Sequence, residues 1–130
     1  MTSLKKVLLG AVLIACTCAK GERTPVSAVR ALIAASATQD RKEVYQLLGA
    51  HTRAALDERA KTAREMAGHR DVRPEEMLAV GWTSPAYQPS AVEEINVSGD
   101  HATVEVVGPH GQRDRVECVR EGGAWRIELP

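Results

Sequence analysis

The chain has 130 residues, and its 17 lysines and arginines are balanced by 17 aspartates and glutamates. This length suits a single domain with one core, and the even charge offers no basic surface that would attract nucleic acid. Aromatic residues make up only 3% of the chain and phenylalanine is missing, so a base-stacking platform is not expected. The core must be built from Val, Leu, Ile and Ala.

The first segment has the three-part layout of a secretory signal. Two lysines precede nine apolar or small residues, 7–15, a run far shorter than the roughly 20 residues that a membrane-spanning helix needs. Residues 13–16, Leu-Ile-Ala-Cys, then resemble the lipobox of bacterial lipoprotein signal peptides. In that family the chain is cut before the cysteine, which receives the lipid. The resemblance implies that Cys16 is the lipid-attachment site and that the protein contacts a membrane through it.

Two alternatives to lipidation remain at this stage. One is ordinary secretion with cleavage nearby, for which residues 17–19, Thr-Cys-Ala, form only a poor small-residue site. The other is a buried segment of a cytosolic protein, which the flanking lysines disfavour. We therefore divide the chain into a signal peptide (1–15), a lipidated cysteine with a short tether (16–23) and a single α+β domain (24–130).

The residue after Cys16 bears on the location of the exported protein. Lipoproteins of Gram-negative bacteria that stay at the inner membrane commonly carry an aspartate at that position, whereas this chain has Thr17. The resemblance therefore implies anchoring to the outer membrane, facing the periplasm, with the outer leaflet of the inner membrane as the alternative. Removal of the leader leaves 15 basic and 17 acidic side chains, a net charge of −2.

The first half of the domain carries helical signals. Thr24 and Pro25 form a helix start with a capping residue and a first-turn proline. Asp40 caps a second, short helix that Gly49 ends, and a third helix is expected over about 51–67 before Gly68. The apolar stripe predicted for the third helix consists of Ala55, Leu56, Ala60, Ala63 and Met66. Residues 74–79 predict one or two more helical turns.

The second half changes to a period of two, which is typical of strands. Residues 99–100, Gly-Asp, predict a two-residue hairpin turn. That turn places Val97 opposite Ala102 and Ile95 opposite Val104, so both pairs share one face.

Residues 122–123, Gly-Gly, predict a second hairpin, with Cys118 opposite Ile127 and Val116 opposite Leu129. Two independent turns thus give one consistent apolar face. Helices followed by an antiparallel meander define an α+β fold, with the N-terminal helices packed against a curved sheet.

Four short patterns resemble a known family. They are Pro-Val-x-Ala-Val (25–29), Asp-x-x-x-Val-x-x-Leu-Leu (40–48), Gly-Asp-x-Ala-x-Val (99–104) and Gly-Gly-x-Trp-Arg-Ile (122–127). They resemble small bacterial lipoproteins with a nuclear-transport-factor-two-like or ketosteroid-isomerase-like domain, also called cystatin-like. The resemblance implies a cone-like sheet wrapped around helices, with a concavity that often holds a pocket. Enzymes, polyketide cyclases, binding domains and assembly proteins all use this fold, so it does not by itself assign a function.

Three side chains are candidates for a pocket or an interface. Trp82 and Tyr87 are two of the few large aromatics, while Trp125 is expected in the core. Glu93 is expected on the same face as Ile95, where a carboxyl group in a pocket would have a raised pKa; its alternative place is the wet edge of the sheet.

These candidates support a first hypothesis of a membrane-anchored, periplasm-facing domain that binds a small ligand or an envelope partner. The alternative is an enzyme of the ketosteroid-isomerase or polyketide-cyclase type, with a pocket acid such as Glu93 as general base. A third possibility is a structural component of the envelope recognised through an exposed apolar patch. No residue is assigned a catalytic role.

No cofactor or metal is expected. The four histidines, His51, His69, His101 and His110, lack the spacing of paired zinc ligands, and no cysteine is near them. Cys18 and Cys118 would be able to pair in an oxidising compartment; the alternative is that Cys118 packs as a small apolar side chain in a strand.

Overall fold

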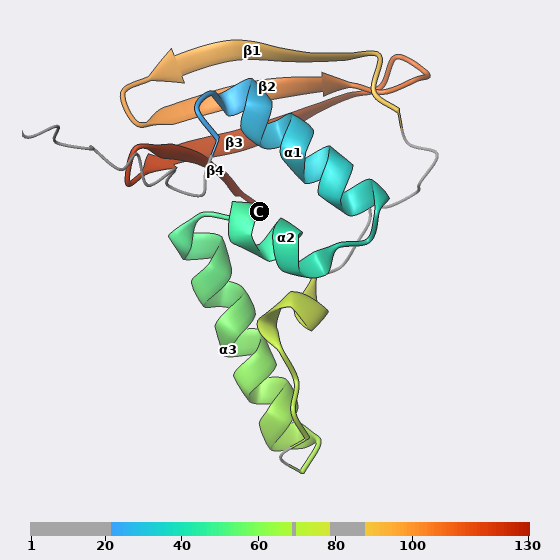
Figure 1. Cartoon of the computed structure of the whole chain (residues 1–130), viewed down its shortest axis with the longest axis vertical. Coiled ribbons are helices and arrows are strands. Elements are labelled where there is room, and N and C mark those ends of the chain that lie inside the picture. The colour runs from blue at the N-terminus through green and yellow to red at the C-terminus, as the bar shows by residue number, and fades with distance from the viewer. Residues whose placement is uncertain (1–21, 69, 79–87) are drawn as a thin grey trace, which may run out of the picture.

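A computed structural model describes residues 22–68, 70–78 and 88–130 (Figure 1). In chain order its elements are α1 (Pro25–Ala37), α2 (Arg41–Leu47), α3 (Ala50–Met66), the 3-10 helix η1 (Pro74–Met77), β1 (Ala91–Ser98), β2 (His101–Val107), β3 (Arg113–Glu121) and β4 (Ala124–Glu128). The strands form one open antiparallel sheet in the order β1-β2-β3-β4. The predicted α+β class, with helices first and a meander last, is confirmed.

The helices α1 and α2 begin at the predicted capping residues. The hydroxyl oxygen of Thr24 accepts a hydrogen bond from the Ser27 amide at 3.0 Å, and the Ser27 hydroxyl oxygen accepts one from the Thr24 amide at 3.1 Å. The Asp40 carboxylate accepts a hydrogen bond from the Glu43 amide at 3.1 Å. These contacts satisfy amides that a helix start leaves without partners. Local sequence therefore sets both helix starts.

The core lies between α1 and the inner face of the sheet, along which α1 runs (Figure 1). The largest fully buried side chains are Leu48, Ile127, Val29, Val104, Val106 and Cys118. Val29 comes from α1 and the others come from the α2–α3 junction and the strands. The apolar stripe of the helix and the apolar face of the meander thus remove each other from water, which is the main stabilising contribution of this interface.

The second hairpin follows the prediction for most of its length. Gly122 and Gly123 both have positive φ, 58° and 79°, as a tight two-residue hairpin turn between twisted strands requires. Cys118 stands opposite Ile127 as predicted. β4 ends at Glu128, however, so the predicted pair that includes Leu129 lies beyond the end of the ladder.

The first hairpin departs from the prediction at one residue. Val97 does stand opposite Ala102, but the residue opposite Val104 is Glu94 and not Ile95. The register shifts between Glu94 and Asn96, which leaves Ile95 as the extra residue of a β-bulge. A bulge adds one residue to one strand and changes which side chains share a face. The predicted pairing of Ile95 with Val104 is therefore wrong, and Ile95 is 44% exposed.

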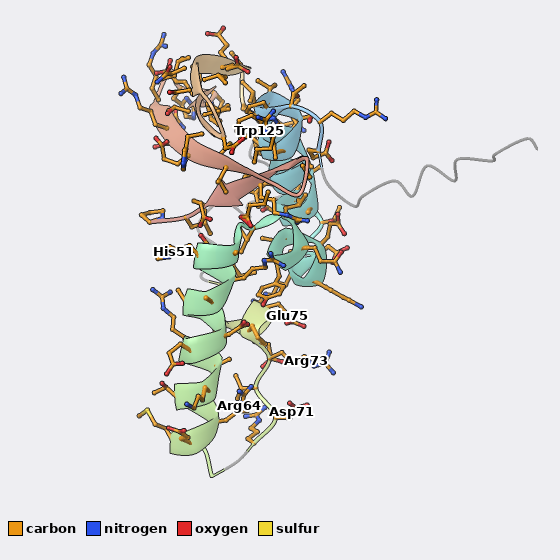
Figure 2. All side chains as sticks on the ribbon, turned by 90° about the vertical axis from the view of Figure 1, so that its left-hand side faces the viewer. His51, Arg64, Asp71, Arg73, Glu75 and Trp125 are labelled. Carbon is orange, nitrogen blue, oxygen red and sulfur yellow. The ribbon has the colours of Figure 1, made fainter. Side chains whose placement is uncertain are left out.

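The helix α3 projects away from the sheet, accompanied by the segment 70–78 (Figures 1 and 2). Leu56 and Ala60 are buried as predicted, whereas Met66, at the far end of the helix, is 85% exposed. The Arg64 guanidinium donates a hydrogen bond to the Val72 carbonyl oxygen at 2.8 Å. The predicted apolar stripe is thus wrong at both ends: Ala55 is exposed, and Met66 is in a last turn that extends past the elements that could cover it.

Substitutions of Ile127 in the core and of Ile95 in the bulge test the packing of the sheet described above. Ile127→Ala should destabilise the domain by about 2–5 kcal/mol, because a fully buried side chain leaves a cavity in the core. The same substitution at the bulge, Ile95→Ala, should change the free energy of unfolding by no more than about 0.5 kcal/mol. Urea unfolding followed by circular dichroism measures both. A cost at Ile95 equal to that at Ile127 would contradict the bulge.

Candidate functional site

The interior between the helices and the sheet is filled with apolar side chains in the part of the chain that the structure describes. Val29 and Leu32 of α1 pack against Val104, Val106 and Ile127 of the strands, and all five are buried. An interior packed in this way leaves no room for a bound molecule without rearrangement of the core. A binding site in the described chain would therefore lie at the surface.

One hollow of about 270 Å³ opens between α1 and the start of β1. It is lined by Arg30, Ile33, Ala34, Ala37, Gln88, Pro89 and Val92. The four α1 residues follow helical spacing, so they form one strip on the side of the helix. Apolar side chains dominate the lining, while Arg30 and Gln88 are exposed. The hollow therefore suits an apolar side chain better than a charged group.

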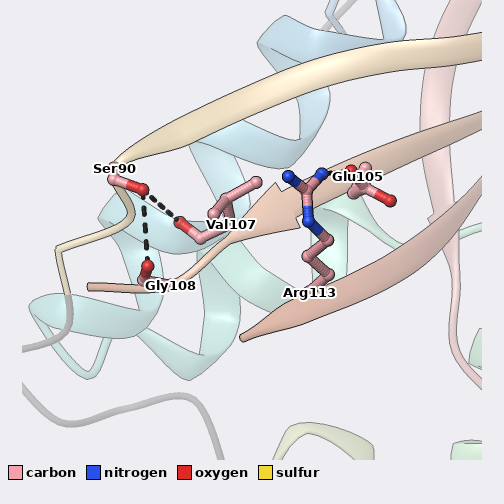
Figure 3. Close-up of polar contacts among 5 residues, drawn as sticks. All are labelled: Ser90, Glu105, Val107, Gly108 and Arg113. Carbon is pink, nitrogen blue, oxygen red and sulfur yellow. Dashed lines mark hydrogen bonds and ion pairs between the residues drawn. The ribbon is translucent and has the colours of Figure 1, made fainter. Parts of the chain in front are cut away.

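The strand wall of this hollow is fixed by hydrogen bonds to the end of β2 (Figure 3). The Ser90 amide donates to the Val107 carbonyl oxygen at 2.8 Å. The Ser90 hydroxyl lies 3.2 Å from the same oxygen and 3.3 Å from the Gly108 carbonyl oxygen, and its single proton can serve one of them at a time. These contacts hold the chain where β1 begins, next to Val92.

The structure places Glu93 away from the hollow. It is exposed and stands opposite Glu105 on the face of the sheet that α1 does not cover. The Glu105 carboxylate forms an ion pair with Arg113 (Figure 3), so Glu93 has an acid as its cross-strand neighbour and no cation of its own. Glu93 is not on the face of Val97, because the bulge between them shifts the alternation, and its exposed place on the edge strand is the alternative position, the wet edge of the sheet.

Of the other residues singled out in the sequence, three lie outside the part of the chain that the structure describes, and one is in the core. Cys16, Trp82 and Tyr87 lie outside the described residues. Trp125 is 6% exposed, which confirms its expected core position (Figure 2). The Arg120 guanidinium lies 5.7 Å from the centre of its ring, a cation–π distance.

A pair of carboxylates caps α3, and sequence reasoning missed it. The helix begins after Gly49, which has no side chain to cap it. Glu121 accepts a hydrogen bond from the Ala50 amide at 2.9 Å, and Glu128 accepts one from the Thr52 amide at 3.0 Å and another from the Thr52 hydroxyl. Negative charge at a helix start is favourable because the free amides and the dipole are positive there. The only sequence signal was a helix start without a capping side chain.

Two side chains have strongly raised pKa values. Burial, together with a hydrogen bond from the Tyr45 hydroxyl to the Asp57 carboxylate at 2.7 Å, raises the pKa of Tyr45 to about 12. Burial, reinforced by the charge of Glu117, raises the pKa of Cys118 to about 12. Both groups are neutral at pH 7, so neither is activated as a base or a nucleophile.

Within residues 22–68, 70–78 and 88–130, no three histidine, cysteine or acidic side chains gather as a metal site would require. None of the helices in these ranges is long and apolar enough to cross a bilayer. Compared with protein-family models and with curated proteins, the sequence matches none of them.

The cap of α3 can be tested at Gly49. A Cβ at this position would lie 2.0 Å from a Glu128 carboxylate oxygen and 2.9 Å from a Glu121 carboxylate oxygen. Gly49→Ala should therefore displace the carboxylates and destabilise the domain by about 1–3 kcal/mol, as expected when charged hydrogen bonds to amides are lost. In a Glu128→Ala background the same substitution should cost clearly less, because the first clash is removed. Equal costs in urea unfolding of both backgrounds would contradict the cap.

The state of Cys118 can be tested by alkylation. A rise in pKa from 9.0 to about 12 lowers the fraction of thiolate at pH 8 by about a thousandfold, and the side chain is also buried. Iodoacetamide should leave Cys118 unmodified in the folded protein and modify it rapidly in urea, as measured by peptide mass spectrometry. Rapid modification of Cys118 under native conditions would show that the strand is not packed as described.

Proposed function

We propose that this chain is an exported lipoprotein domain that is held to an envelope membrane by acylated Cys16 and binds a partner protein or a small ligand at its surface. The observation that carries the anchor is the leader, in which the lysines, the short apolar run and Cys16 stand in the order of a lipoprotein signal. A single acyl chain binds membranes only marginally, so the multiple chains of a lipoprotein cysteine would make the anchor stable.

The described fold sets how far such an anchor would let the domain reach. Glu22 is held to the sheet, because its carbonyl oxygen accepts a hydrogen bond from the Trp125 amide at 2.8 Å. Only the stretch from Cys16 to Glu22 is then available as a tether, which is about 20 Å when fully extended. The domain would therefore work close to its membrane, which we propose is the outer membrane facing the periplasm, or otherwise the outer leaflet of the inner membrane.

We also propose a relationship to the nuclear-transport-factor-two-like domains, with a curved, cone-like sheet. The order of elements supports it, since three helices precede a four-stranded meander. Many members place a short strand between the second and third helices. In this chain Leu48 forms an isolated parallel bridge with Ile127 at the corresponding place, and the Gly49 amide donates to the Ile127 carbonyl oxygen at 2.8 Å.

Binding is a better proposal than the alternative of an isomerase-type or cyclase-type enzyme. Such an enzyme needs an acid and a hydrogen-bond donor that face one point in a closed concavity. In the described part of the chain, the interior is apolar and no carboxyl group lines the hollow beside α1. Glu93, the acid suggested for that role, is on the open face of the sheet.

The anchor has a direct test with a matched control. Cys16→Ala should abolish lipid incorporation and move the protein from the detergent phase to the aqueous phase in a phase-partition experiment, because the thiol is the acceptor of the lipid. Cys18→Ala removes a thiol two residues away and should leave both properties unchanged. Equal partitioning of the Cys16→Ala variant and the parent would contradict lipidation at this residue.

A further inference from the structure

The two edges of the sheet differ in how their backbone groups are used. The β4 edge is covered by two backbone hydrogen bonds, from the Gly49 amide to the Ile127 carbonyl oxygen and from the Trp125 amide to the Glu22 carbonyl oxygen, both 2.8 Å. In the described part of the chain, β1 pairs with β2 on one side and with no strand on the other. A free edge of this kind is a template for the addition of another strand.

The side chains of β1 give this edge a negative charge. Neither carboxylate of Glu93 and Glu94 forms a hydrogen bond or an ion pair within the described residues, and both side chains are exposed. Across the sheet, by contrast, Glu105 is neutralised by Arg113 (Figure 3). Asp100 is neutralised by Arg120. The edge strand is therefore the place on the sheet where two adjacent acids are left without a cation.

The same strand carries exposed apolar side chains. Ile95 is 44% exposed and Val97 is 46% exposed, and these are the two exposed large hydrophobic residues of the described sheet. The hollow beside α1 reaches this edge through Val92. A strand added at the usual spacing of about 4.8 Å from β1 would direct the side chain that stands beside Val92 toward this hollow.

We propose that the free edge of β1 binds an extended segment of a partner protein in which two consecutive lysine or arginine residues stand next to an apolar residue. The added strand forms backbone hydrogen bonds with β1. Because Glu93 and Glu94 are on opposite faces of the sheet, each pairs with one of the two cations, and the apolar side chain enters the hollow beside Ala34. This inference rests on the proposed function, because it names the kind of partner and the surface that receives it.

Charge excludes a second copy of β1 as the occupant. Two β1 strands side by side would bring four unpaired carboxylates onto one ribbon, and like charges on neighbouring strands are destabilising. The bulge at Ile95 also interrupts a regular ladder between two such strands. A cationic strand beside residues 91–94 lies before the bulge, and it replaces repulsion by attraction and gains in association rate at low salt.

The test uses two fluorescein-labelled peptides, one that repeats Val-Lys-Lys and the other that repeats Val-Glu-Glu. At low salt the lysine peptide should bind the protein about tenfold more tightly than the glutamate peptide, as measured by fluorescence anisotropy. Hydrogen exchange should show new protection within residues 91–98 when the lysine peptide is bound. The protein is used as it is produced, with or without lipid, so that failure of the anchor at Cys16 does not affect the result.

Charge reversal provides the control. Glu93→Lys/Glu94→Lys should reverse the preference between the two peptides, while Glu58→Lys/Glu65→Lys, which changes the net charge equally on exposed residues of α3, should keep it. Ala34→Phe should weaken binding of the lysine peptide by several-fold, because it fills the hollow. Absence of binding, protection outside β1, equal effects of the two charge reversals, or unchanged affinity in Ala34→Phe would each contradict the proposal.

Discussion

The packing of α1 on the inner face of the meander is the interaction on which the rest of the structure depends. Val29 of the helix and Val104 and Ile127 of the sheet have no contact with water, and no aromatic side chain other than Trp125 contributes a large fully packed surface on the strands. A core of small branched side chains is stabilised by the apolar surface area that it removes from water and by close packing. Close packing leaves little free volume inside the core. The hollow therefore appears at the border of this interface, where the helix strip at Ala34 extends past the sheet.

Sequence reasoning succeeded where the signal is local. Thr24 and Asp40 specify helix starts through their own side chains, and the glycines at 122–123 supply the positive φ of a hairpin turn. It failed where the outcome depends on distant residues. The cap of α3 comes from Glu121 and Glu128, more than 70 positions away along the chain, and no pattern around the helix start reveals such partners.

The bulge at Ile95 shows why a candidate site is harder to predict than a fold. Alternation of apolar residues identified the strand and the pairing of Val97 with Ala102 correctly. One extra residue leaves the strand intact, yet it reverses the face on which every side chain before it lies. Glu93 thereby lies on the open face at the edge of the sheet, the alternative to a pocket, while the topology of the sheet is as predicted.

The bulge and the cap also explain the difference between the two sheet edges. On the β4 side, Gly49 allows the chain to approach closely, and the carboxylates of β3 and β4 fix α3 there, so the backbone of that edge is used within the domain. On the β1 side, Ile95 in the bulge is 44% exposed and two acids have no cation as a partner. Unpaired acids on an edge discourage copies of the same chain from joining. The arrangement that opposes self-association is therefore also the basis of the partner site that we propose on β1.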